Sequence, residues 1–176
     1  SKMSSIANID GFYYVPRIDK SIVEKYKDDL IVLSGSSYGE IPLKILKYGE
    51  KDAEESLQWW HEKFKGDFYL EIMRHGEEQE EIINSSLIKF SKKYKVKLIA
   101  TNNTYYVAKD EANAHDILLC LKDGEKQSTP IGKGRGFRYG LPNQEYYIKS
   151  QEQMITLFED LPEAISNIKE LVDKID

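Results

Sequence analysis

Residues 68–101, FYLEIMRHGEEQEEIINSSLIKFSKKYKVKLIAT, contain the pattern that decides the fold. Two short apolar runs, at 68–72 and 96–101, flank a segment with helical periodicity at 77–94. The large apolar side chains of this segment fall on one helical face, at Ile83, Leu87, Phe90 and Tyr94. Glutamates begin the segment and lysines end it, as the helix dipole favours. The stretch therefore predicts a strand, a helix and a second strand that runs parallel to the first.

The same alternation of strands and helices continues on both sides of this unit. A third strand is expected at 30–33, and helices are expected at 21–26, 41–48, 52–64 and 110–121. Asp19 is a suitable N-cap for the first of these helices, whereas residues 1–10 are weakly patterned and expected to be frayed. The strands are continuous apolar runs, which is typical of parallel sheets covered on both faces. The fold class is therefore α/β, either a piece of a β/α barrel or an open doubly wound sheet.

The pattern changes after residue 121. Residues 122–140 contain five glycines and little apolar periodicity, which predicts a long loop, and residues 144–149 are expected to form a strand. Ser150 and Gln153 have capping-box spacing at the start of one helix, and a second helix is expected to begin at Asp160 with Pro162 in its first turn. We therefore expect three parts: a partial barrel at 1–121, a Gly/basic loop and strand at 122–149, and a C-terminal helical hairpin at 150–176.

Composition limits the classes of protein to consider. The chain has 176 residues, a formal net charge of −5 and 40% apolar residues, which excludes disorder over most of its length. No run approaches the roughly 18 apolar residues of a membrane span. The single cysteine, Cys120, cannot form an internal disulfide or a cysteine-rich zinc site, and no secretory signal opens the chain, so we expect a cytoplasmic location. The acidic balance disfavours nucleic-acid binding over the whole surface but permits a local basic patch.

Polar segments follow the three expected strands, at 34–36, 74–76 and 101–105. Because the carboxyl ends of parallel strands share one edge of a sheet, we expect these segments to face one pocket, with Glu71 and His75 as pocket residues. One histidine and one carboxylate are too few for a transition-metal site. No Ser-His-Asp set, nucleophile elbow or phosphate-binding loop is present. The sequence therefore predicts no catalytic residue, although a ligand contact by His75 stays open.

The remaining histidines and the cysteine have structural interpretations. His61 is expected to be exposed in the middle of a helix, and His115 is expected to be a hydrogen-bonded structural residue near a helix start. Cys120 lies in an apolar helical segment, which favours a buried small side chain over a nucleophile.

Residues 132–140, GKGRGFRYG, form the most unusual stretch, with four glycines, three cations and two aromatic residues. Such a loop lets its backbone approach phosphates while Lys133, Arg135 and Arg138 neutralise them. Phe137 is placed to stack on a base. The alternative is an exposed loop that pairs with an acidic surface or a neighbouring domain, and the sequence leaves both open.

Short segments in a specific order resemble a known family. They are PRID at 16–19, LSG at 33–35, GEIP at 39–42, FYLE at 68–71, ATN at 100–102, AHDILL at 114–119, LF at 157–158 and LPEA at 161–164. Together they resemble the polymerase-and-histidinol-phosphatase (PHP) domain of the bacterial DNA polymerase III alpha subunit, a C-family replicative polymerase. Segments 72–75 and 101–106 are similar to the Bacteroidetes branch.

The resemblance implies a distorted PHP-type β/α barrel of which this chain is the C-terminal part. Members of the family open with a His-x-His strand, and no histidine precedes His61 here. We therefore expect an expressed fragment that lacks the front portion, with Ser1 left by a cleaved tag.

The resemblance also implies where metal ligands would fall. The family's cysteine matches Ser36, and its Asp-x-His pair matches Asn103 and Tyr105. Asn supplies no anionic oxygen and neutral Tyr is a poor ligand, so no metal is expected at these positions. Similar degraded members are thought to act as scaffolds that stiffen the polymerase and dock the proofreading exonuclease.

The leading hypothesis is a catalytically degenerate PHP scaffold from a replicative polymerase. The resemblance implies DNA-directed DNA synthesis with Mg²⁺ in the parent, at carboxylates outside this segment, and no cofactor here. The implied partners are the rest of the alpha chain, the proofreading exonuclease subunit and, through the parent, DNA, with no membrane. The isolated fragment is expected to expose strand edges that favour a non-native homodimer.

Two alternatives remain. The first is an active metal-dependent 3′–5′ exonuclease or phosphoesterase, which needs an intact upstream His-x-His segment and surrogate ligands such as His75 or Glu71. The second is a stand-alone small α/β protein that binds anions through the loop from Lys133 to Arg138.

Overall fold

The computed structural model describes residues 1–175 and contains a parallel sheet of three strands. The strands are β1 (Val32–Leu33), β2 (Phe68–Ile72) and β3 (Leu98–Ala100), in the order β1-β2-β3. Val32 pairs with Phe68, and Leu70 pairs with Leu98. The predicted parallel α/β arrangement is therefore confirmed as an open three-stranded sheet.

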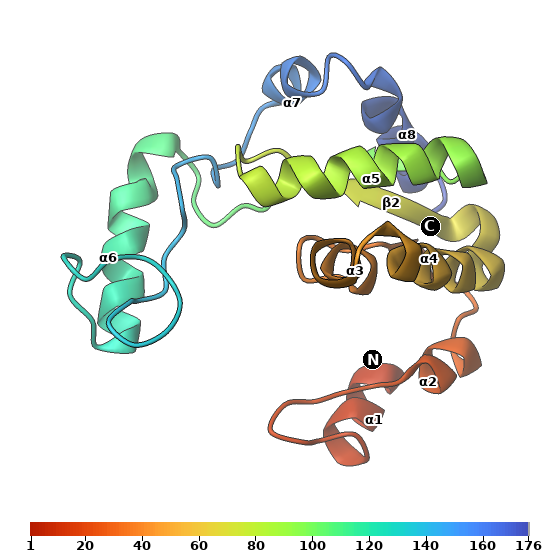
Figure 1. The fold of residues 1–176 in the computed structure, drawn as a ribbon, viewed down its shortest axis with the longest axis horizontal. Helices are drawn as coiled ribbons and strands as arrows, with labels where there is room; N and C mark the ends of the chain where they lie inside the picture. Colours follow the sequence, from red (N-terminus) through yellow and green to blue (C-terminus); the bar gives the residue numbers. More distant parts are fainter. Residues whose placement is uncertain (176) are drawn as a thin grey trace.

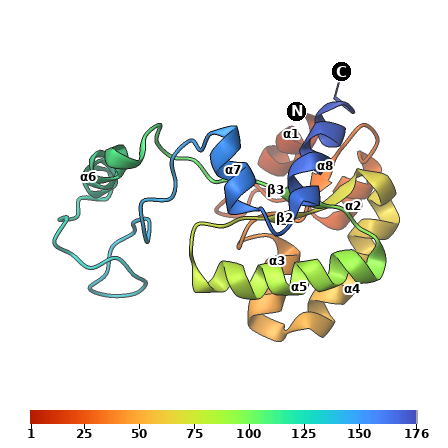
Figure 2. The ribbon, with the colours of Figure 1, turned by 90° about the horizontal axis from the view of Figure 1, so that it is seen from above.

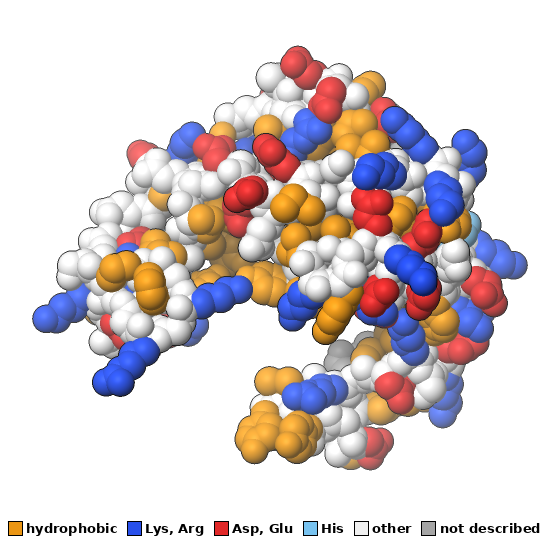
Figure 3. Space-filling model, viewed as in Figure 1, with side chains coloured by type: hydrophobic (Ala, Val, Ile, Leu, Met, Phe, Trp, Pro, Cys, Tyr) orange, Lys and Arg blue, Asp and Glu red, His pale blue; other side chains and the backbone are white. Residues whose placement is uncertain are grey.

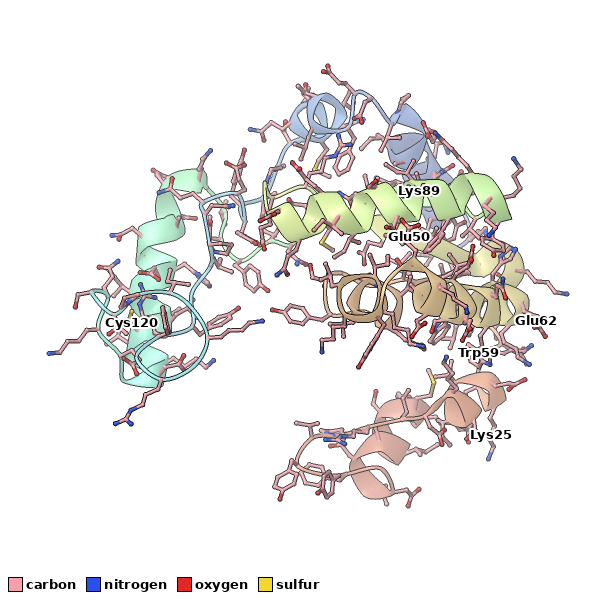
Figure 4. All side chains as sticks on the ribbon, viewed as in Figure 1. Lys25, Glu50, Trp59, Glu62, Lys89 and Cys120 are labelled. Atoms are coloured by element: carbon pink, nitrogen blue, oxygen red, sulfur yellow. The ribbon has the colours of Figure 1, made fainter. Side chains whose placement is uncertain are left out.

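Helices α4 (Glu50–Phe64) and α5 (Glu78–Tyr94) pack on this sheet, and α3 (Glu40–Tyr48) packs on both of them (Figure 1). The core between them includes Leu57, Leu70 and Leu87, none of which has exposed surface. At the rim, Lys89 of α5 lies next to Glu50 of α4, with 2.8 Å between Nζ and Oε1 (Figure 4).

Helix α5 begins and ends as its sequence predicts. Glu77 is the N-cap, and a capping box joins it to Glu80. Lys95 ends the helix in the left-handed conformation, with φ of 57°. The apolar stripe faces the core, because Ile83, Leu87 and Phe90 are buried.

The C-terminal hairpin, α7 (Gln151–Leu157) and α8 (Pro162–Val172), packs on the chain's own sheet. Asn167 of α8 donates a hydrogen bond of 2.8 Å to the carbonyl oxygen of Leu98, which covers the outer edge of β3. The capping box at Ser150 is confirmed. The N-cap of helix α8 is Leu161 rather than Asp160, and the Asp160 carboxylate accepts hydrogen bonds from the Arg74 guanidinium at 2.6 and 2.8 Å.

Two expectations about secondary structure, at residues 1–10 and at 144–149, are wrong. Residues 1–10 are not frayed, since α1 (Lys2–Ile9) forms there, followed by α2 (Lys20–Lys25) with Asp19 as its N-cap. Residues 144–149 form no strand, because Tyr147 makes only an isolated bridge to Tyr106. The two flanking backbone bonds that join these segments are too few to extend a ladder.

Helix α6 (Ala112–Asp123) and the loop at 124–149 form an arm that lies apart from the sheet-centred body in both ribbon views (Figures 1 and 2). A short 3-10 turn, Lys109–Glu111, leads into α6. Several apolar side chains of the arm are exposed, including Leu118 and Leu121. Within residues 1–175, no helix combines the length and the apolar character needed to span a membrane.

Candidate functional site: a pocket at the strand ends

The polar segments after the three strands meet at one cavity of about 330 Å³, which we call the strand-end pocket. Ser36 follows β1, His75 follows β2, and Asn103 and Tyr105 follow β3, and all four line this cavity. Lys133 of the Gly/basic loop reaches the same cavity from the arm. The structure therefore brings together the residues that strand-end reasoning had placed at one edge of the sheet.

Two glycines shape the turn that presents Ser36. Gly35 has φ of 81°, a conformation that residues with a side chain rarely adopt. At Gly39 a Cβ atom would lie 2.1 Å from the carbonyl oxygen of Ser34, so only glycine fits. This tight turn sets α3 directly after β1 and places Ser36 at the mouth of the pocket.

His75 is buried with its ring fixed on both sides. Its Nδ1 lies 2.6 Å from Oε1 of Glu80, and its Nε2 lies 3.3 Å from the carbonyl oxygen of Asn103. The imidazole also stacks on Tyr146, with ring centroids 4.3 Å apart and planes 7° apart. Because both ring nitrogens lie close to protein oxygens, a metal ion or a substrate would have to displace one of these contacts to reach the imidazole.

The carboxylates of the strand-end pocket are also engaged. Although burial works to raise it, hydrogen bonds from His75 hold the pKa of Glu80 below its usual range. Glu77 accepts a hydrogen bond from the Tyr146 hydroxyl. Burial and this carboxylate raise the pKa of Tyr146, so its hydroxyl stays protonated at neutral pH. The acidic groups therefore stabilise the pocket wall.

Glu71, the other predicted pocket residue, lies outside the strand-end pocket. It borders a much smaller hollow of about 10 Å³, together with Ser36 and Glu80. Burial raises the pKa of Glu71, and Thr101 donates a hydrogen bond of 2.7 Å to its carboxylate. Glu71 and His75 are thus neighbours in sequence that do not share one cavity.

The three positions where the resemblance placed lost metal ligands, Ser36, Asn103 and Tyr105, all line the strand-end pocket. Among residues 1–175, no group of three or more His, Cys, Asp or Glu side chains could hold a metal ion. Ser36, Asn103 and Tyr105 offer hydroxyl and amide groups, which are weak ligands for divalent transition metals, and the stronger donors His75, Glu77 and Glu80 are engaged with other protein groups. The chemistry of these side chains does not fit a resident metal ion of that kind.

The Gly/basic loop divides into a buried and an exposed part. Arg138 was a candidate phosphate contact, but its guanidinium binds the Asp116 carboxylate at 2.6 and 2.9 Å, and the residue is only 6% exposed. This ion pair lowers the pKa of Asp116. Arg138 is therefore an internal anchor of the arm, whereas Arg135 and Phe137 remain exposed. Phe137 packs over Gly132, where a Cβ atom would lie 2.4 Å from its ring.

The environments of His61 and His115 differ from those predicted from the sequence, whereas Cys120 is buried as predicted. His61 is half-buried rather than exposed, and its Nδ1 has no hydrogen-bond partner within the described residues. His115 makes no side-chain hydrogen bond in that range, but its ring lies 5.6 Å from Tyr105 and 5.5 Å from Tyr106. Cys120 is buried on α6 (Figure 4), as predicted.

Sequence reasoning missed the two residues that fix His75. Tyr146 comes from a segment far along the chain, and no local signal marks it as a stacking partner. The role of Glu80 could have been predicted from the sequence. The capping-box spacing from Glu77 directs the Glu80 side chain back toward the helix start, where His75 lies.

The parallel sheet and its strand-end pocket define a PHP-type α/β domain, and residues 1–75 match the sequence profile of the PHP domain. The match includes β1, β2 and His75, and so covers part of the pocket.

The chain is also similar over nearly its whole length to DNA polymerase III alpha subunits. It is 42% identical to that of Borreliella burgdorferi over 99% of the chain, and 38% and 37% identical to those of Campylobacter jejuni and Helicobacter pylori (strain 26695) over 98% of the chain. The chain spans about 15% of the length of these relatives. It belongs to the DNA polymerase III alpha subunit family as the counterpart of one part of those proteins.

Proposed function

We propose that this chain is a catalytically inactive PHP scaffold within a polymerase subunit of its relatives' size. The observation that carries the proposal is the state of the strand-end pocket. His75 has both ring nitrogens occupied, and Ser36, Asn103 and Tyr105 stand where the resemblance places metal ligands. A phosphoesterase needs a metal-bound or base-activated water, and these side chains provide neither.

The activity of the whole subunit lies outside these residues. We propose that the parent extends DNA from deoxynucleoside triphosphates with Mg²⁺ held by carboxylates elsewhere in the chain. Its partners would be the rest of the alpha chain, a proofreading exonuclease subunit and DNA, in the cytoplasm. The relatives' names support the polymerase part of this proposal.

Lys133, Arg135 and Phe137 remain the proposed phosphate or nucleic-acid contacts of the Gly/basic loop. Arg135 and Phe137 are exposed, and neither Lys133 nor Arg135 makes an ion pair within residues 1–175. Cations without an internal partner can neutralise phosphates at little cost. Arg138 is no longer among these proposed contacts, because its guanidinium is paired with Asp116.

A separate surface supports the expected self-association of the isolated segment. Hydrophobic side chains gather at the lower end of the molecule in Figure 3, where Phe12, Tyr13, Tyr14 and Val15 are exposed. A patch of this kind favours burial against another protein surface. Sedimentation of the chain over a range of concentrations tests whether it forms a homodimer.

Metal content and nuclease activity of the full-length subunit test the scaffold proposal. We expect substoichiometric metal at the PHP region and no chelator-sensitive cleavage of single-stranded DNA. Stoichiometric metal there, together with cleavage that a chelator abolishes, would overturn the proposal.

A restoration variant tests the assignment of the pocket positions. The triple change Ser36→Cys, Asn103→Asp and Tyr105→His should raise metal uptake by the full-length subunit, because it returns three good donors to one cavity. The matched control changes Ser37→Cys, whose side chain lines the cavity at a position without an assigned ligand role. Unchanged uptake by the triple variant, with upstream ligands present, would contradict the assignment.

A further inference from the structure

A second cavity, of about 200 Å³, lies under α6 and apart from the sheet. We call it the α6 pocket, and it is lined chiefly by Tyr106, His115, Leu119, Ile131, Leu141 and Gln144. The cavity is smaller than the roughly 300 Å³ at which sites for drug-sized ligands begin. Its size limits an occupant to a single ring system or a few water molecules.

Tyr106 lines this cavity, and its hydroxyl lacks a hydrogen-bond partner within the described residues. Tyr106 is 9% exposed, and its hydroxyl is buried without a hydrogen bond to any of residues 1–175. A buried hydroxyl without a partner costs free energy, so native proteins rarely leave one. Burial raises the pKa of Tyr106, which keeps the hydroxyl protonated as both donor and acceptor.

Two other polar side chains of the α6 pocket lack partners, and its carboxylate is already paired. His115 and Gln144 make no side-chain hydrogen bond within the described residues. The one carboxylate in the wall, Asp116, is occupied by Arg138 and by Gln127, at 3.0 Å. An occupant would therefore meet unpaired donors and acceptors and no free carboxylate.

Aromatic rings border the α6 pocket, and a loop that carries two cations adjoins it. The His115 ring centroid lies 5.6 Å from that of Tyr105 and 5.5 Å from that of Tyr106, and both pairs are tilted rather than stacked. Ile131 of the wall begins the loop that carries Lys133 and Arg135. A planar group in the α6 pocket would thus have unpaired cations within the adjoining loop.

We propose that the α6 pocket binds a nucleobase, with the Tyr106 hydroxyl and the Gln144 amide at the edge of the base and His115 at its face. The attached phosphates would then meet the adjoining loop, whose cations are Lys133 and Arg135. Stacking accepts any base, so this site would tolerate different bases but would not bind a strand that lacks them. The α6 pocket adjoins the strand-end pocket, since Leu141 lines both, but the proposal does not depend on whether the strand-end pocket is inactive.

Fluorescence anisotropy tests this site in the 176-residue chain, whose fold is checked by circular dichroism. The probes are a labelled oligothymidylate and an oligonucleotide of the same length made of abasic sites. We expect the base-containing strand to bind about tenfold more tightly than the abasic strand. Free thymidine as competitor distinguishes a site for single nucleosides, which it would empty, from one that requires a strand.

Two variants separate the base contact from the phosphate contact. Tyr106→Phe removes a hydroxyl that has no internal partner, so it should keep the fold and weaken the base-containing strand about fivefold. Lys133→Ala with Arg135→Ala should weaken both strands alike. The control Tyr94→Phe, whose hydroxyl bonds Gln58 on the body, should change neither.

Equal affinity for the two strands would overturn the nucleobase site and leave only phosphate contacts by the loop. No binding of either strand, or unchanged binding by Tyr106→Phe and by His115→Ala, would overturn it as well. None of these outcomes bears on the metal and nuclease test of the strand-end pocket, so the two proposals fail separately.

Discussion

The sheet-centred body and the arm of α6 and residues 124–149 are held together by different interactions. The body has an apolar core in which Leu57, Leu70 and Leu87 are fully buried. The arm leaves Leu118 and Leu121 more than half exposed and is tied together by the buried pair of Arg138 and Asp116. The body is therefore stabilised by burial of apolar surface, whereas the arm depends on a few specific polar contacts.

The largest expected effect separates these two kinds of stabilisation. Leu87→Ala should lower the free energy of unfolding by about 3 kcal/mol, because Leu87 has no exposed surface and the change leaves a cavity. Leu121→Ala is the matched change on the arm, where the side chain is 75% exposed, and should cost under about 0.5 kcal/mol. Urea denaturation measures both, and similar losses would show that the arm also relies on apolar packing.

The arm should respond most strongly to loss of its central ion pair. Arg138→Ala leaves Asp116 without its bidentate partner and also removes a hydrogen bond of 2.9 Å to the carbonyl oxygen of Thr129. Backbone amides at 127–140 should then exchange with solvent on the order of tenfold faster, while those of β2 and α5 stay protected. Hydrogen–deuterium exchange measures this, with Arg135→Ala as the exposed control. Equal deprotection of the body would mean that the two regions unfold as one unit.

A smaller effect concerns the link between the N-terminal helices and the body. The Glu40 carboxylate accepts hydrogen bonds from Lys20 at 2.9 Å, Ser56 at 2.8 Å and Trp60 at 2.9 Å. Partial burial works to raise the pKa of Glu40, but these bonds outweigh it and lower the pKa to about 2. Since the folded-state pKa lies below the unfolded value, this stabilisation is complete above about pH 4.5 and is lost as the pH falls toward 2.

The variant Glu40→Gln should remove this pH dependence. After allowance for screening by solvent, we expect a loss of about 1–2 kcal/mol near neutral pH and a flatter stability profile between about pH 5 and pH 2. Glu55→Gln, an exposed change on the neighbouring helix, is the control. Denaturant titrations across this pH range would contradict the assignment if both variants kept the parent's slope.

The same division explains what the sequence could predict. The strands of the body and helix α5 were predicted because apolar patterning is a local signal, visible at 30–33 and within the window at 68–101. In the arm, α6 and the long loop were predicted, but the partner of Arg138 and the path of residues 144–149 were not, because these depend on polar partners distant in sequence. Arg138 finds Asp116 on the preceding helix, and residues 144–149 bond to the chain at 105–106 through two backbone contacts.

The candidate site was predictable to the same extent. Strand-end reasoning placed Ser36, His75, Asn103 and Tyr105 together, because parallel strands carry their carboxyl ends to one edge. It could not show that Glu71 would lie outside the cavity, since that depends on the packing of its side chain. The stacking of Tyr146 on His75 likewise arises only when the arm returns to the sheet.

The smallest expected effect lies at Ser150, where the arm rejoins the body. The Ser150 hydroxyl accepts a hydrogen bond of 3.3 Å from the backbone N–H of Gln153, and the Gln153 side chain accepts one of 2.8 Å from the backbone N–H of Ser150. Ser150→Ala removes one half of this capping box and should cost about 1 kcal/mol. Ser166→Ala, on the exposed side of α8, should be nearly neutral.

The residues whose amides exchange faster in Ser150→Ala show whether the arm and the body are held separately. If the arm and the body are held separately, Ser150→Ala should speed amide exchange in α7 and leave the Arg138–Asp116 contact and the amides at 127–140 unchanged. Faster exchange throughout the arm would instead mean that the cap of α7 fixes the path of the whole loop. In that case the return of the chain at Ser150, and not the ion pair, would determine where Lys133 and Tyr146 lie at the strand-end pocket.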